Sequence, residues 1–122
     1  MPNRPRRPSR SSNGTAEALR RFKADVFQVL ANPKRIHIVE CLRDGELSVK
    51  SIQKRVKIEL PAVSQHLAAL KAKRLVTWRK EGNQVFYALR DPLLTEVLDT
   101  MRLYFHAHID EAMAVLRALR IR

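Results

Sequence analysis

The chain has 122 residues, enough for one compact domain and too few for two of ordinary size. An apolar content of 45% excludes general disorder. No apolar run approaches the roughly eighteen residues of a membrane span, so no membrane segment is expected. The net charge of +12 favours a polyanionic partner, with nucleic acid first. Cys41 as the single cysteine excludes an intrachain disulfide framework and indicates a reducing compartment, so a cytoplasmic protein is expected.

The positive charge is uneven along the chain. Residues 50–80 carry nine bases against Glu59 as the single acid, and residues 1–14 carry four arginines and no acid. The segments 15–49 and 81–122 are each close to neutral. Residues 50–80 are therefore the predicted contact region for nucleic acid.

Residues 1–14 are rich in Pro, Ser and Arg and contain almost nothing apolar. Such a segment cannot bury enough surface to offset the entropy lost on ordering, so we expect a flexible basic N-terminal arm. Its charge leaves two roles open, a contact with DNA or none. The folded domain is predicted to span residues 15–120.

Two helices are predicted at the start of this domain. Thr15 is a suitable N-cap, and apolar residues recur at steps of three and four from Ala18 to Leu30, which defines one helical face. Asn32 and Pro33 break this pattern, and Pro33 suits the first turn of a second helix. Asp44-Gly45 ends that second helix.

The next segment predicts two short helices joined by a tight turn, which is the pattern of a helix-turn-helix. Ser48 can cap the first of them, in which Val49, Ile52 and Val56 point inward, and residues 57–60 form the connection. The second begins near Pro61, and its inward-facing apolar residues recur at steps of four and three: Val63, Leu67 and Leu70.

Polar residues near the start of this second helix are the expected contacts to base edges in the DNA major groove: Ser64, Gln65 and His66. Gln can pair bidentately with adenine, and Ser is permissive. Basic residues of the same region are the expected contacts to DNA phosphates: Lys54, Lys57, Lys71, Lys73, Arg79 and Lys80. Phosphate contacts supply affinity without sequence information.

A β-hairpin is predicted directly after the recognition helix. Residues 75–80 and 84–89 are rich in β-branched and aromatic side chains, and Gly82 lies between them. A hairpin in this position is the wing that reaches the DNA backbone or minor groove. Trp78 is expected to be structural, packed in the core or at the hinge of the hairpin.

A long helix is predicted to begin at Asp91-Pro92, with an apolar stripe from Leu94 to Leu119. At about 40 Å it is longer than a domain of this size can cover. We therefore expect a homodimer in which the first and last helices pair across a two-fold axis, so that two recognition helices bind a near-palindrome. The predicted fold is mainly α with a small β-hairpin, a winged helix-turn-helix.

The order of these elements resembles the ArsR family of bacterial transcriptional regulators over residues 17–118. The resemblance lies in the start of the second helix, the first half of the helix-turn-helix, the recognition helix with its exit, and the wing: Asn32-Pro33-Lys34-Arg35-Ile36, Gly45-Glu46-Leu47-Ser48-Val49, Val63-Ser64-Gln65-His66-Leu67 with Leu70, Leu75-Val76, and Gly82 with Phe86-Tyr87. The resemblance implies a dimeric repressor whose operator affinity falls when an inducer, often a metal ion, binds.

The metal sites of that family are not reproduced. One uses a cysteine-x-cysteine pair where this chain has residues 47–51 without a thiol, which excludes arsenic or cadmium sensing of that kind. Another uses an aspartate-x-histidine pair on the last helix, where this chain has Asp99 followed by Met101. His106 and Asp110 share a helical face, so with help from the other subunit they could ligate Zn or Ni. The alternative is that both are polar residues on a solvated or interfacial stripe.

Cys41 lies on the apolar side of the second helix, so we expect a packed thiol with little thiolate character rather than a redox sensor.

Two positions depart from the family pattern. Lys57 replaces the usual turn glycine, which costs on the order of 1 kcal/mol where φ is positive. Leu60-Pro61 replaces polar residues at the start of the recognition helix, so an unusual operator is expected.

The predicted function is a dimeric, sequence-specific regulator of transcription that binds double-stranded DNA and is released by an unidentified signal. A basic RNA-binding or architectural protein is the alternative, although the seven aromatic residues lie mostly at core-like positions. An enzyme is not expected, because the sequence contains no glycine-rich phosphate loop, nucleophile elbow or dense His/Asp/Cys cluster.

Overall fold

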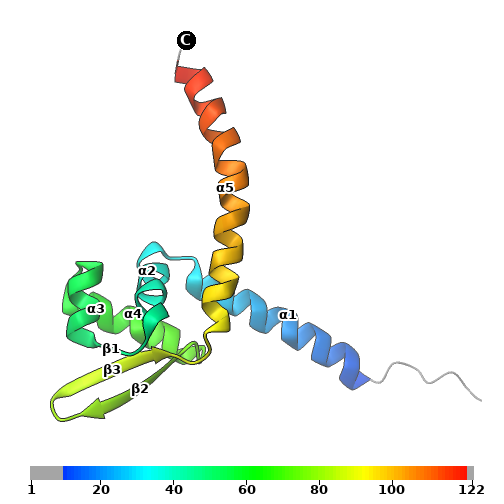
Figure 1. Ribbon diagram of the computed structural model, residues 1–122. Coiled ribbons are helices and arrows are strands. Elements are labelled where there is room, and N and C mark those ends of the chain that lie inside the picture. Colours follow the sequence, from blue (N-terminus) through cyan, green and yellow to red (C-terminus); the bar gives the residue numbers. More distant parts are fainter. Residues whose placement is uncertain (1–9, 121–122) are drawn as a thin grey trace, which may run out of the picture.

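The computed structural model describes residues 10–120, which form helices and a small antiparallel sheet (Figure 1). In chain order the elements are α1 (Arg10–Leu30), α2 (Pro33–Cys41), the 3₁₀ turn η1 (Leu42–Asp44), β1 (Leu47–Ser48), α3 (Val49–Val56), α4 (Leu60–Ala72), β2 (Val76–Glu81), β3 (Gln84–Leu89) and α5 (Leu93–Arg120). This order confirms the predicted winged helix-turn-helix. Helices α1 and α5 extend from the body in different directions (Figure 1).

Helix α1 begins earlier than predicted. It starts at Arg10, so Thr15 lies inside it, and the prediction that Thr15 is the N-cap is wrong. The last proline of the N-terminal segment is Pro8, and extending an existing helix by a turn needs no new nucleation. The expected arm therefore overlaps α1 at residues 10–14, and the rest of it, residues 1–9, lies outside the described residues.

Helix α2 starts where the sequence predicts. Asn32 is its N-cap, and the Asn32 Oδ1 accepts hydrogen bonds from the backbone N–H groups of Lys34 at 2.9 Å and Arg35 at 3.2 Å. Pro33 occupies the first turn. These contacts fix the direction of the turn that carries Arg35. At the other end, η1 follows α2, and Gly45 with a φ of 135° redirects the chain, as expected for this position.

The core lies where α2, α3, α4 and the start of β2 meet. Val49, predicted to point inward, is only partly buried against this core. The other predicted inward positions of the helix-turn-helix are buried in it: Ile52, Val56, Val63, Leu67 and Leu70. Ser48 caps α3 as predicted, and its hydroxyl accepts a hydrogen bond from the Ser51 N–H at 3.1 Å. Cys41 is half-buried against this core, and burial raises the pKa of its thiol, in agreement with the expected low thiolate character.

The described sheet has one strand more than the predicted hairpin. Strand β1 pairs antiparallel with β3, which also pairs with β2, so the strand order is β1-β3-β2. A strand of two residues has no alternation that a sequence pattern can detect. At the other end of the sheet, Glu81 pairs with Gln84 across a two-residue turn. The φ of 60° at Gly82, the first turn residue, is typical of a type II′ turn.

The prediction that Trp78 packs in the core or at the hinge is wrong. Its side chain is 49% exposed, and the Lys71 Nζ lies 4.2 Å from the centre of its ring. Within β2 only Val76 is buried, because the hairpin projects beyond the body and leaves its later residues no core to contact (Figure 1). Trp78 therefore lies on the surface beside the recognition helix.

Lys57 adopts a left-handed backbone conformation at the end of α3, with φ 57° and ψ 48°. A side chain in this conformation costs about 1 kcal/mol, which Gly avoids. We expect Lys57→Gly to raise the free energy of unfolding, measured by urea denaturation, by about that amount. Arg74, also at φ 57°, is a matched position where Arg74→Gly should give a similar gain. Unchanged or lower stability of both variants would contradict the prediction.

Candidate nucleic-acid interface

Helix α4 presents an exposed face opposite the core. Residues on this side recur at one-turn steps and together define what we call the α4 face: Leu60, Pro61, Ser64, Gln65, Ala68, Lys71 and Ala72. Ser64 and Gln65, both predicted to contact bases, lie in its middle. Sequence reasoning missed Leu60 and Ala68, because an apolar residue near a core pattern is usually assigned to the core. Apolar side chains at these positions can contact the methyl group of thymine.

The structure separates His66 from Ser64 and Gln65. The His66 side chain is half-buried toward α2, and its Nδ1 accepts a hydrogen bond from the Arg35 Nε at 3.3 Å. Burial, followed by the positive charges of Arg35 and Lys34, lowers the pKa of His66. His66 is therefore less exposed than Ser64 and Gln65, and its Nδ1 already has a partner. Its position borders the buried positions of α4, so its ring reaches the neighbouring helix.

Some of the side chains predicted to contact phosphates already form ion pairs with carboxylates, and others do not. Lys54, Lys57 and Lys80 are exposed and form no ion pair within residues 10–120. Lys73 lies 3.5 Å from the Asp25 carboxylate of α1, an exposed pair that contributes little stability. Three lysines on α3, the following turn and the wing are thus available to bind an anion.

Arg79 is already engaged by carboxylates. Its Nη2 lies 2.6 Å from Glu46, its Nη1 lies 2.5 Å from Glu81, and its guanidinium lies over the ring of Phe86. The hydrogen bonds that Arg79 donates to Glu46 and Glu81 raise the pKa of Arg79, and the bonds that Glu46 accepts lower the pKa of Glu46. Arg79 therefore ties the wing to the residues before β1, and a phosphate would compete with both carboxylates for it.

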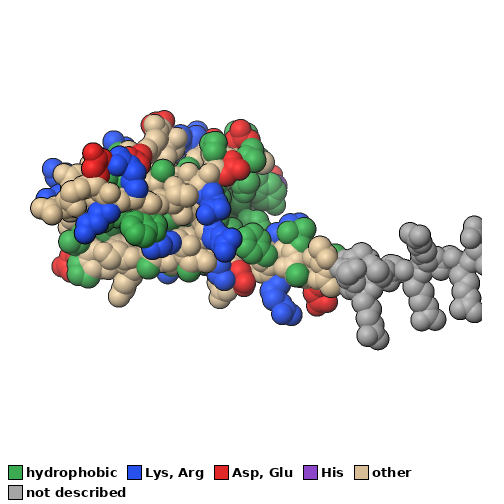
Figure 2. All heavy atoms as spheres, turned by 90° about the horizontal axis from the view of Figure 1, so that it is seen from below, with side chains coloured by type: hydrophobic (Ala, Val, Ile, Leu, Met, Phe, Trp, Pro, Cys, Tyr) green, Lys and Arg blue, Asp and Glu red, His purple; other side chains and the backbone are tan. Residues whose placement is uncertain are grey.

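The face viewed in Figure 2 contains the hairpin side of the body. Lys and Arg side chains lie across it, with apolar side chains exposed between them (Figure 2). Such a mixture suits a nucleic-acid duplex, which presents charged phosphates along its backbone and apolar groups such as the thymine methyl in its major groove.

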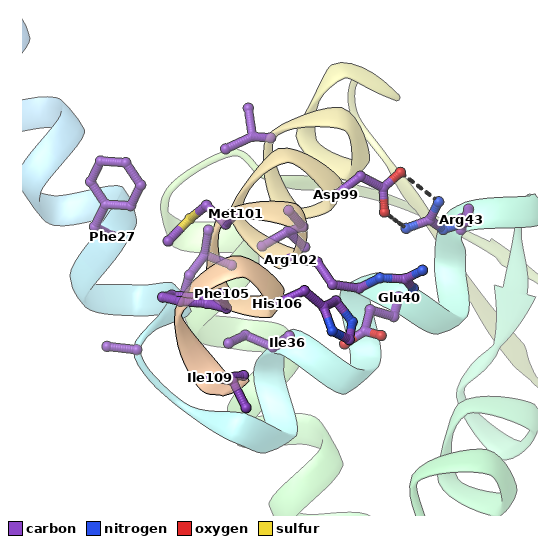
Figure 3. Close-up of a pocket in the computed structure, with 14 residues that line it drawn as sticks. Phe27, Ile36, Glu40, Arg43, Asp99, Met101, Arg102, Phe105, His106 and Ile109 are labelled. Carbon is purple, nitrogen blue, oxygen red and sulfur yellow. Dashed lines mark hydrogen bonds and ion pairs between the residues drawn. The ribbon is translucent and has the colours of Figure 1, made fainter. Parts of the chain in front are cut away.

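A second surface feature is an apolar groove of about 760 Å³ between α1, α2 and α5 (Figure 3). Phe27 of α1 lies opposite Met101 and Phe105 of α5 (Figure 3). Phe27 is 53% exposed and Phe105 47% exposed, and apolar surface of this kind marks an interaction site. Arg43 and Asp99 form an ion pair at the groove, with 2.5 Å between nitrogen and oxygen.

The predicted metal ligands meet no third ligand in the described part of the chain. His106 and Asp110 are both exposed on α5, one turn apart. Among residues 10–120, no three His, Cys, Asp or Glu side chains come together in a way that could hold a metal ion. One chain by itself therefore does not fit Zn or Ni.

The described helices include none with the length and apolar character needed to span a membrane.

Similar sequences identify the family. A family model described as "Bacterial regulatory protein, arsR family" matches residues 32–77, from the N-cap of α2 into β2. The HTH-type transcriptional regulator Rv0081 of Mycobacterium tuberculosis is 33% identical over 106 residues, which cover 86% of this chain and 93% of that protein. The transcriptional activator HlyU of Vibrio cholerae is 37% identical over 84 residues, 68% of this chain and 78% of HlyU. The match to the regulator KmtR of M. tuberculosis is 40% identical but spans only 52% of KmtR.

Solved structures agree with this assignment. The crystal structure of M. tuberculosis Rv0081 matches with a TM-score of 0.71 and 30% identity, covering 78% of this chain and 96% of that one. The solution structure of the homodimeric winged helix-turn-helix domain of Mb0332 from Mycobacterium bovis matches with a TM-score of 0.70 and 28% identity, covering 79% and 89%. The chain therefore belongs to the arsR family of bacterial regulatory proteins, and it is a transcriptional regulator rather than an enzyme.

Proposed function

We propose that this chain binds double-stranded DNA as a homodimer in the cytoplasm and represses transcription. The observation that carries the proposal is the α4 face, whose polar centre, Ser64 and Gln65, is exposed. The elements before and after α4 in the chain carry Lys54, Lys57 and Lys80, which are exposed and have no ion pair among the described residues. An α-helix fits the width of the major groove, and cations on neighbouring elements can bind the flanking phosphates. An exposed polar helix face without cations on neighbouring elements would lack these phosphate contacts, which supply much of the affinity for DNA.

We assign the base contacts to Ser64 and Gln65 and the apolar contacts to Leu60 and Ala68. Gln65 has both a donor and an acceptor at its end, which matches the pattern that adenine presents in the major groove. His66 is left out of this set because its ring is half-buried against α2. Specificity is therefore concentrated in the first three turns of α4.

We assign the phosphate contacts to Lys54, Lys57, Lys71 and Lys80. Lys71 lies on the α4 face over Trp78, and the other three have no competing carboxylate among the described residues. Arg79 and Lys73 are paired with acids and are assigned weaker contributions. Residues 1–9, outside the described part of the chain, carry three more arginines, whose charge would add to the attraction for DNA.

The groove between α1 and α5 supports a homodimer. Its large exposed apolar side chains would be removed from water by the same surface of a second copy, as a two-fold interface requires. The related domain of Mb0332 is described as homodimeric. A two-fold dimer carries two α4 faces, so we expect a near-palindromic operator with half-sites about one DNA turn apart.

The proposal is tested by selecting duplexes from a random-sequence DNA pool with the full chain. The selected duplex, a scrambled duplex and a double-stranded RNA of the selected sequence are then titrated by fluorescence anisotropy. We expect tight binding to the selected duplex, with an affinity at least a thousandfold above that for scrambled DNA. Equal binding to all three nucleic acids would replace the proposal with a non-specific architectural role.

Gln65→Ala is expected to weaken binding to the selected duplex by about 1 to 3 kcal/mol and to leave the scrambled duplex unchanged. Lys54→Ala is the matched control on the neighbouring helix. It should weaken both duplexes alike and, because a dimer loses two cations, lower the slope of log affinity against log salt by about two. Equal losses on both duplexes for Gln65→Ala would remove Gln65 from the base contacts.

Repression follows from occupancy of promoter DNA and is tested with a reporter gene placed behind the selected duplex. Reporter expression should rise when the regulator gene is deleted. A fall would instead indicate activation, the role named for HlyU.

Adding Zn, Ni or a chelator to the anisotropy titration tests whether His106 and Asp110 from two subunits form a metal site. Release of DNA that depends on the metal would indicate such a site. Metal-independent binding would point to a different signal.

A further inference from the structure

A single side chain, that of Arg35, contacts both α1 and α4 from its place on α2. Its Nη1 donates a hydrogen bond to the Val29 carbonyl oxygen near the end of α1 at 3.2 Å, and its Nε donates to the His66 Nδ1 of α4 at 3.3 Å. The backbone of Arg35 is itself held by the N-cap Asn32. The Arg35 guanidinium therefore links the helix that lines the apolar groove with the helix that carries the α4 face.

The bond to Val29 has a specific cause in the sequence. In a continuing helix this carbonyl would accept from the N–H group four residues later, but that residue is Pro33, which has none. The Arg35 side chain supplies the missing donor. Pro33, which starts α2, thus leaves the Val29 carbonyl oxygen at the end of α1 without its helical donor, and the Arg35 side chain replaces that donor.

The bond to His66 requires a neutral imidazole. The guanidinium can only donate, so the His66 Nδ1 must be unprotonated to accept. The charged groups that act on the ring within the described residues are Arg35 and Lys34, both cations of α2. Burial and these charges lower the pKa of His66, so the accepting form predominates at neutral pH.

We propose that Arg35 and His66 are a positioning pair that holds α4 at the angle at which Ser64 and Gln65 reach the bases. The pair lies one residue from Gln65 in the first half of α4, where the N-cap Glu59 makes no side-chain capping bond. Of residues 60–66, which make up that half, only Val63 is buried in the core, so the bond from Arg35 supplies directional restraint. This inference rests on the proposed DNA binding.

The sign of the pH dependence separates this role from a direct DNA contact. A positioning His66 loses its bond on protonation and then faces two cations, so affinity for the selected duplex falls as the pH drops below about 6.5. A His66 that contacted DNA would gain charge on protonation, and affinity would rise. The same bond should stabilise the folded chain above about pH 6.5 and be lost as the pH falls through the lowered pKa of His66.

The test uses five variants of the full chain, titrated by anisotropy against the selected and scrambled duplexes between about pH 5.5 and 8. Arg35→Lys keeps the charge but has one donor nitrogen in place of the separate Nε and Nη1 that Arg35 uses for its two partners, and His66→Ala removes the acceptor. We expect each to weaken the selected duplex about tenfold, the double variant to lose no more than either single one, and scrambled DNA to bind as before. His66→Asn, which retains an acceptor near Nδ1, should bind as wild type at pH 7 and lose the pH dependence below it. Lys34→Ala is the matched control and should bind as wild type at pH 7, where His66 is neutral with or without the Lys34 charge.

Two further measurements distinguish a failure of the positioning role from unfolding of a variant and from a failure of the proposed DNA binding. The ¹⁵N shifts of His66 in the free protein should show an unprotonated Nδ1 that is perturbed by Arg35→Lys, and thermal unfolding identifies any variant that is weak because it is unfolded. Rising affinity at low pH, or fully additive losses in the double variant, would overturn the positioning role while DNA binding stands. If wild type selects no duplex, the proposed function fails, and the positioning role fails with it.

Discussion

Replacing Phe105 by Asp is expected to convert the dimer to a monomer and to weaken binding to the selected duplex by at least about a hundredfold. Phe105 lines the groove between α1 and α5 and is 47% exposed in one copy. In a two-fold interface the substitution buries two unpaired carboxylates, each costing several kcal/mol. A monomer then engages one half-site and loses the gain from two linked contacts.

The control for this prediction is Leu103→Asp. Leu103 is on the same helix, two residues away, but does not line the groove and is 70% exposed. It should leave the dimer and the affinity as they are, as measured by light scattering with size exclusion and by anisotropy. If Leu103→Asp dissociates the dimer and Phe105→Asp does not, the interface lies on another face of α5.

Leu67→Ala is expected to lower the free energy of unfolding by about 3 kcal/mol, within the range measured for buried leucines. Leu67 is 1% exposed and lies in the core cluster with Ile52 and Leu70. The loss combines the transfer free energy of the removed atoms with the cavity that the surrounding helices cannot fill. Urea denaturation measures it directly, and a parallel fall in affinity at 37 °C would reflect the unfolded fraction.

Leu60→Ala provides the same chemical change at an exposed position of the same helix. Leu60 is 47% exposed on the α4 face, so its stability effect should remain within about 1 kcal/mol. Its effect on DNA affinity should be the larger one, because we assign Leu60 an apolar contact to a base. Equal destabilisation by both variants would contradict the assignment of Leu67 to the core and Leu60 to the surface.

The helix-turn-helix was predictable because its signals are local. The steps of three and four among Ile52, Val56, Val63, Leu67 and Leu70 mark the buried faces, and all five are buried. Caps obey the same logic, since an N-cap needs only a suitable side chain and the next turn of backbone. Ser48 accordingly caps α3 as predicted, whereas the predicted cap Thr15 lies inside α1 because α1 begins a turn earlier.

The candidate site was only partly predictable, because exposure and partners depend on neighbouring elements. His66 and Gln65 are adjacent and equally polar in the sequence, yet Arg35, thirty-one positions from His66, draws one ring toward α2 while Gln65 stays exposed. Arg79 looked like a free cation, but the pairing of β1 with β3 brings Glu46 beside it. Trp78 looked like a core residue, but the hairpin extends past the core.

By itself, the sequence determined the order of the helices and hairpin, the buried faces of α3 and α4, and the concentration of positive charge in residues 50–80. Periodicity, caps and charge depend on residues that are close together in the chain, so they can be recognised from the sequence. Only the tertiary structure decided which cations are free, which polar side chain of α4 turns inward, and that one arginine joins α1 to the recognition helix. Those outcomes depend on contacts between residues far apart in the chain, and such contacts exist only once the helices have packed.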